Sequence, residues 1–232
     1  MTDFRQSLPP TLSIVVPVFN ETANLRPLLT RTRAALHELD TTYEFVFVDD
    51  GSTDDTPQQL SHVADDDPHV RVVRLSRNFG HQAALVAGLS HARGDAVITM
   101  DGDLQHPPEL IPLFVTAWRQ GADIVQAIRR APADESPVKR TGSRLFYRLL
   151  TAVTRVPVTP GAADFRLMTR ETVNAFLACG ERVRFNRGLV RWIGFDCREI
   201  PYDAEPRHAG HSKYSWRAMF RLAGDAIFSF SS

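Results

Sequence analysis

The sequence predicts an α/β domain in which helices flank a mostly parallel β-sheet. Short apolar runs without a helical period alternate with segments whose leucines or alanines recur at helical spacing. Acidic clusters follow two of these runs, at Asp49-Asp50 and at Asp101-Gly102-Asp103. Strands that alternate with helices form right-handed βαβ units, and such sheets bind ligands at the carboxyl ends of their strands. We therefore expect a site where these clusters meet.

The first strand is expected at residues 12–18, an apolar run rich in β-branched side chains. Asn24 is the expected N-cap of the helix that follows. The apolar stripe of this helix consists of Leu25, Leu28, Leu29, Leu36 and Leu39. A second strand is expected at residues 45–48, after which Thr56 and Pro57 are the expected cap and first position of another helix.

The alternation continues with a strand at residues 70–75 and an alanine-rich helix at residues 81–91. The next apolar run ends at Asp101. A helix from about residue 108 to 120 and a short strand at about 124–127 follow. The sheet is therefore expected to extend through this whole part of the chain.

Beyond residue 130 the pattern changes, and a proline-bearing loop precedes a helix expected at residues 138–153. Its arginines fall on one helical face, which is either an anion-binding stripe or a solvated surface: Arg140, Arg144 and Arg148. Another helix is expected at residues 170–178. Residues 211–232 combine aromatic side chains with arginines, which favours an amphipathic segment at a membrane interface over a core-packing helix. We divide the chain into a domain at residues 1–210 and this segment.

Composition excludes several classes of protein. The net charge of zero gives no field that would attract nucleic acid, and 43% hydrophobic residues are ample for a core. Cys179 and Cys197 lack metal-ligand spacing and are expected as free thiols. There is no signal-peptide pattern and no apolar run long enough to cross a bilayer.

The acidic pair Asp101 and Asp103 is the strongest candidate for chemistry. If the segment stays extended, both carboxylates point the same way and can bind one cation, with Gln105 adding a neutral oxygen. Gly102 between them leaves room for a ligand near the backbone. Oxygen ligands favour Mg²⁺ or Mn²⁺, which usually serve substrate phosphates. The alternative is a solvated acidic turn.

Other charged residues suit a phosphorylated ligand. Asp50 can accept hydrogen bonds from a base or a ribose, while Arg129, Arg207 and Lys213 can bind diphosphate oxygens. No Walker loop and no Gly-x-Gly-x-x-Gly follows the first strand, so the usual ATP and dinucleotide signatures are missing.

Several motifs in order carry a family resemblance. They are Val15-Val16-Pro17-Val18-Phe19-Asn20-Glu21, Val48-Asp49-Asp50-Gly51-Ser52-Thr53-Asp54, Arg77-Asn78-Phe79-Gly80-His81-Gln82, Asp101-Gly102-Asp103-Leu104-Gln105-His106-Pro107-Pro108-Glu109, Asp164-Phe165-Arg166-Leu167 and Gly210-His211-Ser212-Lys213-Tyr214. From about residue 12 to its end the chain resembles glycosyltransferase family 2, and within it the polyprenyl-phosphate glycosyltransferases. The resemblance implies a GT-A type, Rossmann-like fold.

The resemblance also implies roles for individual residues. The nucleotide-sugar donor would be bound by Pro17, Phe19, Glu21, Asp50, Asp101, Gly102, Asp103, Arg129, Arg207, Ser212 and Lys213. Asp101, Asp103 and Gln105 would bind the metal, and Arg140, Ser143 and Arg144 would bind the acceptor phosphate. Asp164 is either a catalytic base or acceptor-positioning group, or an acid paired with Arg166.

We accordingly expect an inverting, metal-dependent enzyme that transfers a hexose from a nucleotide sugar to a polyprenyl phosphate. A phosphate monoester is already anionic at neutral pH, so the acceptor needs arginines to place it more than a base to activate it. A UDP-sugar is the favoured donor, and GDP-mannose stays open. The expected location is the cytoplasmic face of the cell membrane, reached either peripherally or through transmembrane helices that are not in this sequence, and a homo-oligomer is possible. The alternatives are a family member that glycosylates a polysaccharide or protein hydroxyl, and a non-enzymatic receiver-like or nucleotide-binding module.

Overall fold

A computed structural model describes residues 10–130, 159, 161–179 and 186–203. The expectations for residues 138–153 and 211–232 lie outside this part of the chain. Within it, no helix is long and apolar enough to cross a membrane.

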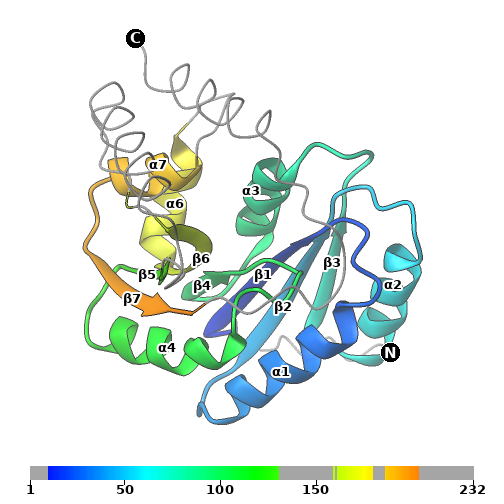
Figure 1. The fold of residues 1–232 in the computed structure, drawn as a ribbon, viewed down its shortest axis with the longest axis horizontal. Coiled ribbons are helices and arrows are strands. Elements are labelled where there is room, and N and C mark those ends of the chain that lie inside the picture. The colour runs from blue at the N-terminus through cyan, green and yellow to red at the C-terminus, as the bar shows by residue number, and fades with distance from the viewer. Residues whose placement is uncertain (1–9, 131–158, 160, 180–185, 204–232) are drawn as a thin grey trace, which may run out of the picture.

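The described residues form a seven-stranded sheet between two layers of helices (Figure 1). In sheet order, the strands are β3 (Val70–Arg74), β2 (Tyr43–Asp49), β1 (Leu12–Val18), β4 (Ala96–Thr99), β6 (Ala162–Thr169), β5 (Ile124–Arg129) and β7 (Cys197–Tyr202). The strands β1 to β4 pair in parallel, and so do β5 and β7. The strand β6 runs antiparallel to both its neighbours, β4 and β5. The prediction of a mostly parallel sheet is confirmed.

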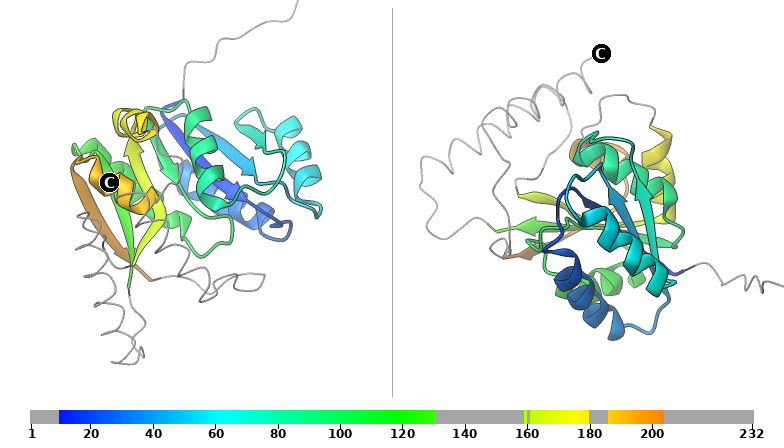
Figure 2. Two further views of the ribbon diagram at one scale, coloured as in Figure 1. Left: turned by 90° about the horizontal axis from the view of Figure 1, so that it is seen from above. Right: turned by 90° about the vertical axis from the view of Figure 1, so that its right-hand side faces the viewer.

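One helical layer comprises α1 (Leu25–His37), α2 (Thr56–Asp66) and α4 (Ile111–Arg119), the last preceded by a 3₁₀ turn, η1 (Pro108–Leu110). The other comprises α3 (His81–His91), α6 (Arg170–Ala178) and α7 (Asn186–Trp192), which Figure 2 shows from two further directions. Alternate residues of β1 face opposite layers, since Ile14 and Val16 pack with α1 while Val15 packs with α3. Every residue of β1 is buried, as expected for a central parallel strand.

Two expectations about helix starts need correction. Asn24 is the N-cap of α1, but its side chain does not cap the helix and instead donates from Nδ2 to Glu21 Oε2 at 2.6 Å. Helix α2 begins at Thr56 rather than after it, with Asp55 at the N-cap and Pro57 in the first turn. Proline fits there because the amides of a first turn have no partner within the helix.

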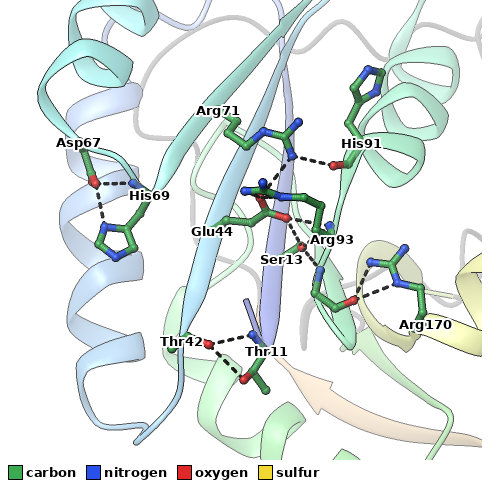
Figure 3. Close-up of polar contacts among 11 residues, drawn as sticks. Thr11, Ser13, Thr42, Glu44, Asp67, His69, Arg71, His91, Arg93 and Arg170 are labelled. Atoms are coloured by element: carbon green, nitrogen blue, oxygen red, sulfur yellow. Dashed lines mark hydrogen bonds and ion pairs between the residues drawn. The ribbon is translucent and has the colours of Figure 1, made fainter. Parts of the chain in front are cut away.

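The amino-terminal edge of the sheet is closed by a polar network around Glu44, a buried residue of β2 (Figure 3). Glu44 Oε1 accepts hydrogen bonds from the Ser13 hydroxyl at 2.8 Å and from the Arg93 amide at 2.7 Å. The Arg93 guanidinium donates to Glu44 Oε2 from two nitrogens, at 3.0 and 2.9 Å. Burial alone would raise the pKa of Glu44, but the bonds from Ser13 and Arg93 outweigh it and hold that pKa below its usual value. This network joins β1, β2 and the segment before β4 at the amino ends of the strands, opposite the acidic clusters.

Candidate functional site

The acidic clusters meet at the carboxyl edge of the sheet. Strand β1 lies between β2 and β4 in the sheet. After β1 the chain forms β2 and β3 on one side of it and then crosses over to form β4 on the other side. This is the topological switch point at which open α/β sheets bind ligands. The end of β1 and the acidic turn after β4 touch there, since a Cβ on Gly102 would lie 3.4 Å from the Pro17 carbonyl oxygen and 3.0 Å from Val18 Cγ1.

The Asp101–Asp103 segment is a turn and not an extended strand end, which corrects the expected geometry. Strand β4 ends at Thr99, Gly102 and Asp103 lie in the turn, and Leu104 adopts a positive φ of 62°. The Asp103 carboxylate accepts a hydrogen bond from the Gln105 amide at 3.1 Å, which tightens the turn. Asp103 is buried and Asp101 is half-buried. Their shared direction therefore cannot be argued from the alternation of a strand.

Two histidines that the sequence left without a role lie against Asp101. His81, the first residue of α3, places Nε2 at 3.3 Å from Asp101 Oδ1 and 3.5 Å from Asp164 Oδ2. His106 places Nε2 at 3.6 Å from Asp101 Oδ2, and its Nδ1 accepts the Asp101 amide at 3.0 Å. Sequence spacing gave no hint of His81, because only the fold brings α3 to the end of β4.

Asp164 lies at this edge because β6 is antiparallel. Thr99 of β4 is in register with Arg166, so the amino-terminal part of β6 meets the carboxyl end of β4. The Thr99 hydroxyl donates to the Asp164 carbonyl oxygen at 2.6 Å. Asp164 Oδ1 accepts from Arg166 at 2.7 Å, and both side chains are buried. Of the two predicted readings, the ion pair is thus present, and Oδ2 still faces His81.

The loops after β1 and β2 are bonded to each other. The Asn20 amide donates to Ser52 Oγ at 2.9 Å, and the Thr22 hydroxyl donates to Asp54 Oδ2 at 2.6 Å. Burial would raise the pKa of Asp54, but hydrogen bonds from Thr22 and Thr56 outweigh it and lower that pKa. These bonds link the loop that carries Glu21 to the loop after β2.

Asp50 holds a third loop. Its Oδ1 accepts the Phe79 amide at 2.7 Å and its Oδ2 accepts the Gly80 amide at 2.9 Å, immediately before α3. Gly51 has a φ of +70°, and a Cβ there would lie 2.6 Å from the Arg77 carbonyl carbon, so the two loops touch backbone to backbone. A pocket beside them is lined by Gly51, Ser52, Arg74, Leu75, Ser76 and Arg77.

The residues of the acidic turn fit a divalent cation. Among the described residues Asp101 Oδ1 is buried and accepts no hydrogen bond, although His81 Nε2 lies 3.3 Å away, so this oxygen could bind a cation. The described residues contain no group of three or more His, Cys, Asp or Glu side chains placed to bind a metal. Asp101, Asp103 and Gln105 are the side chains through which this turn could offer oxygens to a cation.

The predicted site residues divide between this edge and the undescribed parts of the chain. Pro17 is buried at the end of β1, and Phe19 and Glu21 are half-buried just beyond it. Arg129 is exposed at the end of β5, the same edge of the sheet. The remaining predicted residues lie outside the described part: Arg140, Ser143, Arg144, Arg207, Ser212 and Lys213.

Comparison with known sequences gives a consistent result. The family model described as glycosyl transferase family 2 matches residues 13–177. An uncharacterized glycosyltransferase of Synechocystis sp. is 44% identical over 220 residues, which cover 95% of this chain and 69% of that protein. The bactoprenol glucosyl transferase of Shigella phage SfV is 39% identical over 222 residues, covering 95% of this chain and 72% of that protein.

Solved structures share the fold. A mannosyltransferase from Pyrobaculum calidifontis in complex with GDP-Man and Mn²⁺ superposes with a TM-score of 0.59 at 20% identity, over 97% of this chain and 64% of that one. Glucosyl-3-phosphoglycerate synthase from Mycobacterium tuberculosis, in complex with Mn²⁺ and UDP-Glc, gives a TM-score of 0.61 at 20% identity, over 95% and 77% of the two chains. At this identity the likeness concerns the fold alone.

Proposed function

The chain belongs to glycosyl transferase family 2, and from this membership we propose that it transfers a hexose from a nucleotide sugar to a polyprenyl phosphate. The observation that carries the proposal is the Asp101–Asp103 turn at the switch point of the sheet, beside the bonded loops after β1 and β2. The acceptor class is supported by the relatives named bactoprenol glucosyl transferase. A UDP-sugar is the favoured donor, with GDP-mannose as the alternative.

The reaction is a direct displacement with inversion. An oxygen of the lipid phosphate forms a bond to the anomeric carbon, while the bond from that carbon to the diphosphate oxygen breaks. The electron pair of the broken bond leaves with the nucleoside diphosphate, so no oxidant or reductant is needed. Bound Mg²⁺ or Mn²⁺ would supply charge neutralisation at the departing diphosphate.

The residues of the chain then have distinct tasks. Asp101, Asp103 and Gln105 bind the cation. The nucleoside is received by Pro17 at the end of β1 and by Phe19, Glu21 and Asp50 in the loops after β1 and β2. Arg129, Arg207, Ser212 and Lys213 contact donor phosphates, and Arg140, Ser143 and Arg144 place the lipid phosphate. Because Arg166 already pairs with Asp164, we assign Asp164 to positioning the acceptor side rather than to proton abstraction.

The proposed lipid acceptor supports association with a membrane, and we propose that the protein acts at the cytoplasmic face. Residues 1–210 would form the catalytic domain, and residues 211–232 would lie in the interface.

The test is nucleoside diphosphate release from UDP- and GDP-sugars with Mn²⁺, with and without undecaprenyl phosphate. We expect release that needs the lipid phosphate and that is lost in Asp103→Ala. Release that ignores the lipid but responds to a soluble hydroxyl acceptor would overturn the assignment of the acceptor. Release that is unchanged in Asp103→Ala would overturn the metal site.

A further inference from the structure

We propose that His106 is a positioning residue that fixes Asp101 for the cation, an inference that rests on the proposed function. The hydrogen bond from the Asp101 amide to His106 Nδ1 is its central observation. None of the roles assigned above includes this histidine.

The backbone of the turn needs such a support. Leu104 has a φ of 62°, a conformation that costs an L-residue with a side chain roughly 1–2 kcal/mol. Its side chain is buried in the core layer that contains α1 and α4. This conformation reverses the chain, so that His106 lies back over Asp101 and can accept its amide proton. The bond therefore closes the turn that carries both acidic residues.

The hydrogen bond also fixes the state of the imidazole ring. A backbone amide can only donate, so Nδ1 must accept and the proton of the neutral ring is on Nε2. Nε2 faces Asp101 Oδ2 at 3.6 Å. The same ring thus accepts the backbone amide of Asp101 at Nδ1 and faces Oδ2 of its carboxylate with Nε2. Since His106 is only 5% exposed, water does not compete for these contacts.

Aromatic packing holds the ring from the other side. The imidazole stacks on Phe165 with ring centroids 5.2 Å apart and an interplanar angle of 14°. Tyr202 of β7 approaches at 6.2 Å, edge to face. Phe165 directly follows Asp164, so the same ring joins the acidic turn to the strand that carries the acceptor-side carboxylate. A ring held this firmly fixes the direction of Asp101.

Two substitutions separate the nitrogen atoms of the ring. In His106→Asn the amide oxygen takes the place of Nδ1 and can accept the Asp101 amide, whereas in His106→Gln the amide group reaches only the place of Nε2. Mn²⁺ affinity is measured by the electron paramagnetic resonance of free Mn²⁺, in the presence of UDP and, separately, GDP. His62→Gln, on the exposed part of α2, is the matched control.

We expect His106→Asn to bind Mn²⁺ within about threefold of the wild type and His106→Gln to lose roughly tenfold or more, the usual effect of removing a group that orients a metal ligand. Excess Mn²⁺ should restore turnover by His106→Gln, a rescue that a merely misfolded variant would not show. If His106→Gln does not fold, His106→Ala, which also removes the Nδ1 acceptor, takes its place in the same measurement.

Equal Mn²⁺ affinity of folded His106→Gln and wild type would overturn the inference. So would a tenfold loss in His106→Asn, because the bond to Nδ1 would then not be what positions Asp101. A wild-type protein that binds no Mn²⁺ with either nucleotide would instead overturn the proposed function, so the two failures are distinguishable.

Discussion

Replacing Asp50 with asparagine tests whether one carboxylate organises the donor side of the site. Both of its oxygens accept backbone amides, at 2.7 Å from Phe79 and 2.9 Å from Gly80, and the residue is 3% exposed. Asparagine retains one acceptor and turns an NH₂ group toward the other amide. The variant therefore loses a charge-assisted bond and leaves a backbone donor unsatisfied.

The expected cost follows from these two losses. A hydrogen bond to a charged group contributes about 1.5–3 kcal/mol, and an unsatisfied buried donor costs about 1–3 kcal/mol. Because the two losses concern the same hydrogen bond and partly overlap, Asp50→Asn should destabilise the fold by roughly 2–4 kcal/mol. For a chain of this size that lowers the thermal midpoint by about 5–15 °C. Nucleotide affinity should fall as well, because the loop before α3 is no longer fixed.

The assay is thermal unfolding followed by circular dichroism, with Asp65→Asn as the matched control. Asp65 is an exposed acid of α2. An Asp50→Asn variant that unfolds at the temperature of the control would refute the reasoning. A variant with wild-type stability but weakened nucleotide binding would show that Asp50 acts on the ligand alone.

Three further predictions concern stability, each measured by urea denaturation. Glu44→Gln should destabilise the protein at pH 7. Because the pKa of Glu44 is lower in the folded state, the charged carboxylate stabilises the fold above the unfolded pKa of about 4.3, and this stabilisation is lost as the pH falls through the folded-state pKa. The stabilities of the variant and the wild type should therefore converge in acid. Gly88→Ala should cost about 1–3 kcal/mol, because the new Cβ would lie 2.3 Å from Val15 Cγ1 in the packed core. Arg166→Met should cost about 3–5 kcal/mol by leaving the Asp164 carboxylate buried without its partner, and adding Asp164→Asn should recover part of that loss.

Each of these has a contrary result. A stability difference at Glu44 that stays constant from pH 7 into acid would show that its charge is not involved. Wild-type stability in Gly88→Ala would mean that α3 can move away from β1. Purely additive losses at Arg166 and Asp164 would mean that the two side chains are not coupled.

The sequence was sufficient for the parallel half of the sheet, because each of its strands is a short run rich in apolar or β-branched residues with a local signal. It was insufficient for β6 and β7. Strand β6 carries Asp164 and Arg166, which interrupt the apolar pattern, and its place between β4 and β5 depends on pairing with distant residues. The expected strand at residues 124–127 proved to extend to Arg129 for the same reason, since β7 pairs along all of it.

The candidate site divides in a similar way. The acids after β2 and β4 could be read from the sequence, because polar residues after buried strands share one edge of a sheet. The conformation of the acidic turn could not be read from the sequence. It depends on a positive φ at Leu104, and a leucine rarely adopts that conformation. His81 and His106 were missed because their relation to Asp101 arises from tertiary packing and not from spacing.

The order of strands also has a consequence for synthesis on the ribosome. Strands β1 to β4 have all been synthesised by residue 99, just before the acidic turn, but β4 lacks its second neighbour until β6 follows. Within the part of the chain that the structure describes, the partners of strand β5 are β6 and β7, both of which follow residue 161. A nascent chain therefore exposes an unpaired edge of β4 over this interval, the kind of edge that invites pairing with other chains. Asp164 comes to lie against His81, which also faces Asp101, only when β6 covers that edge, so the same step protects the nascent chain and completes the site.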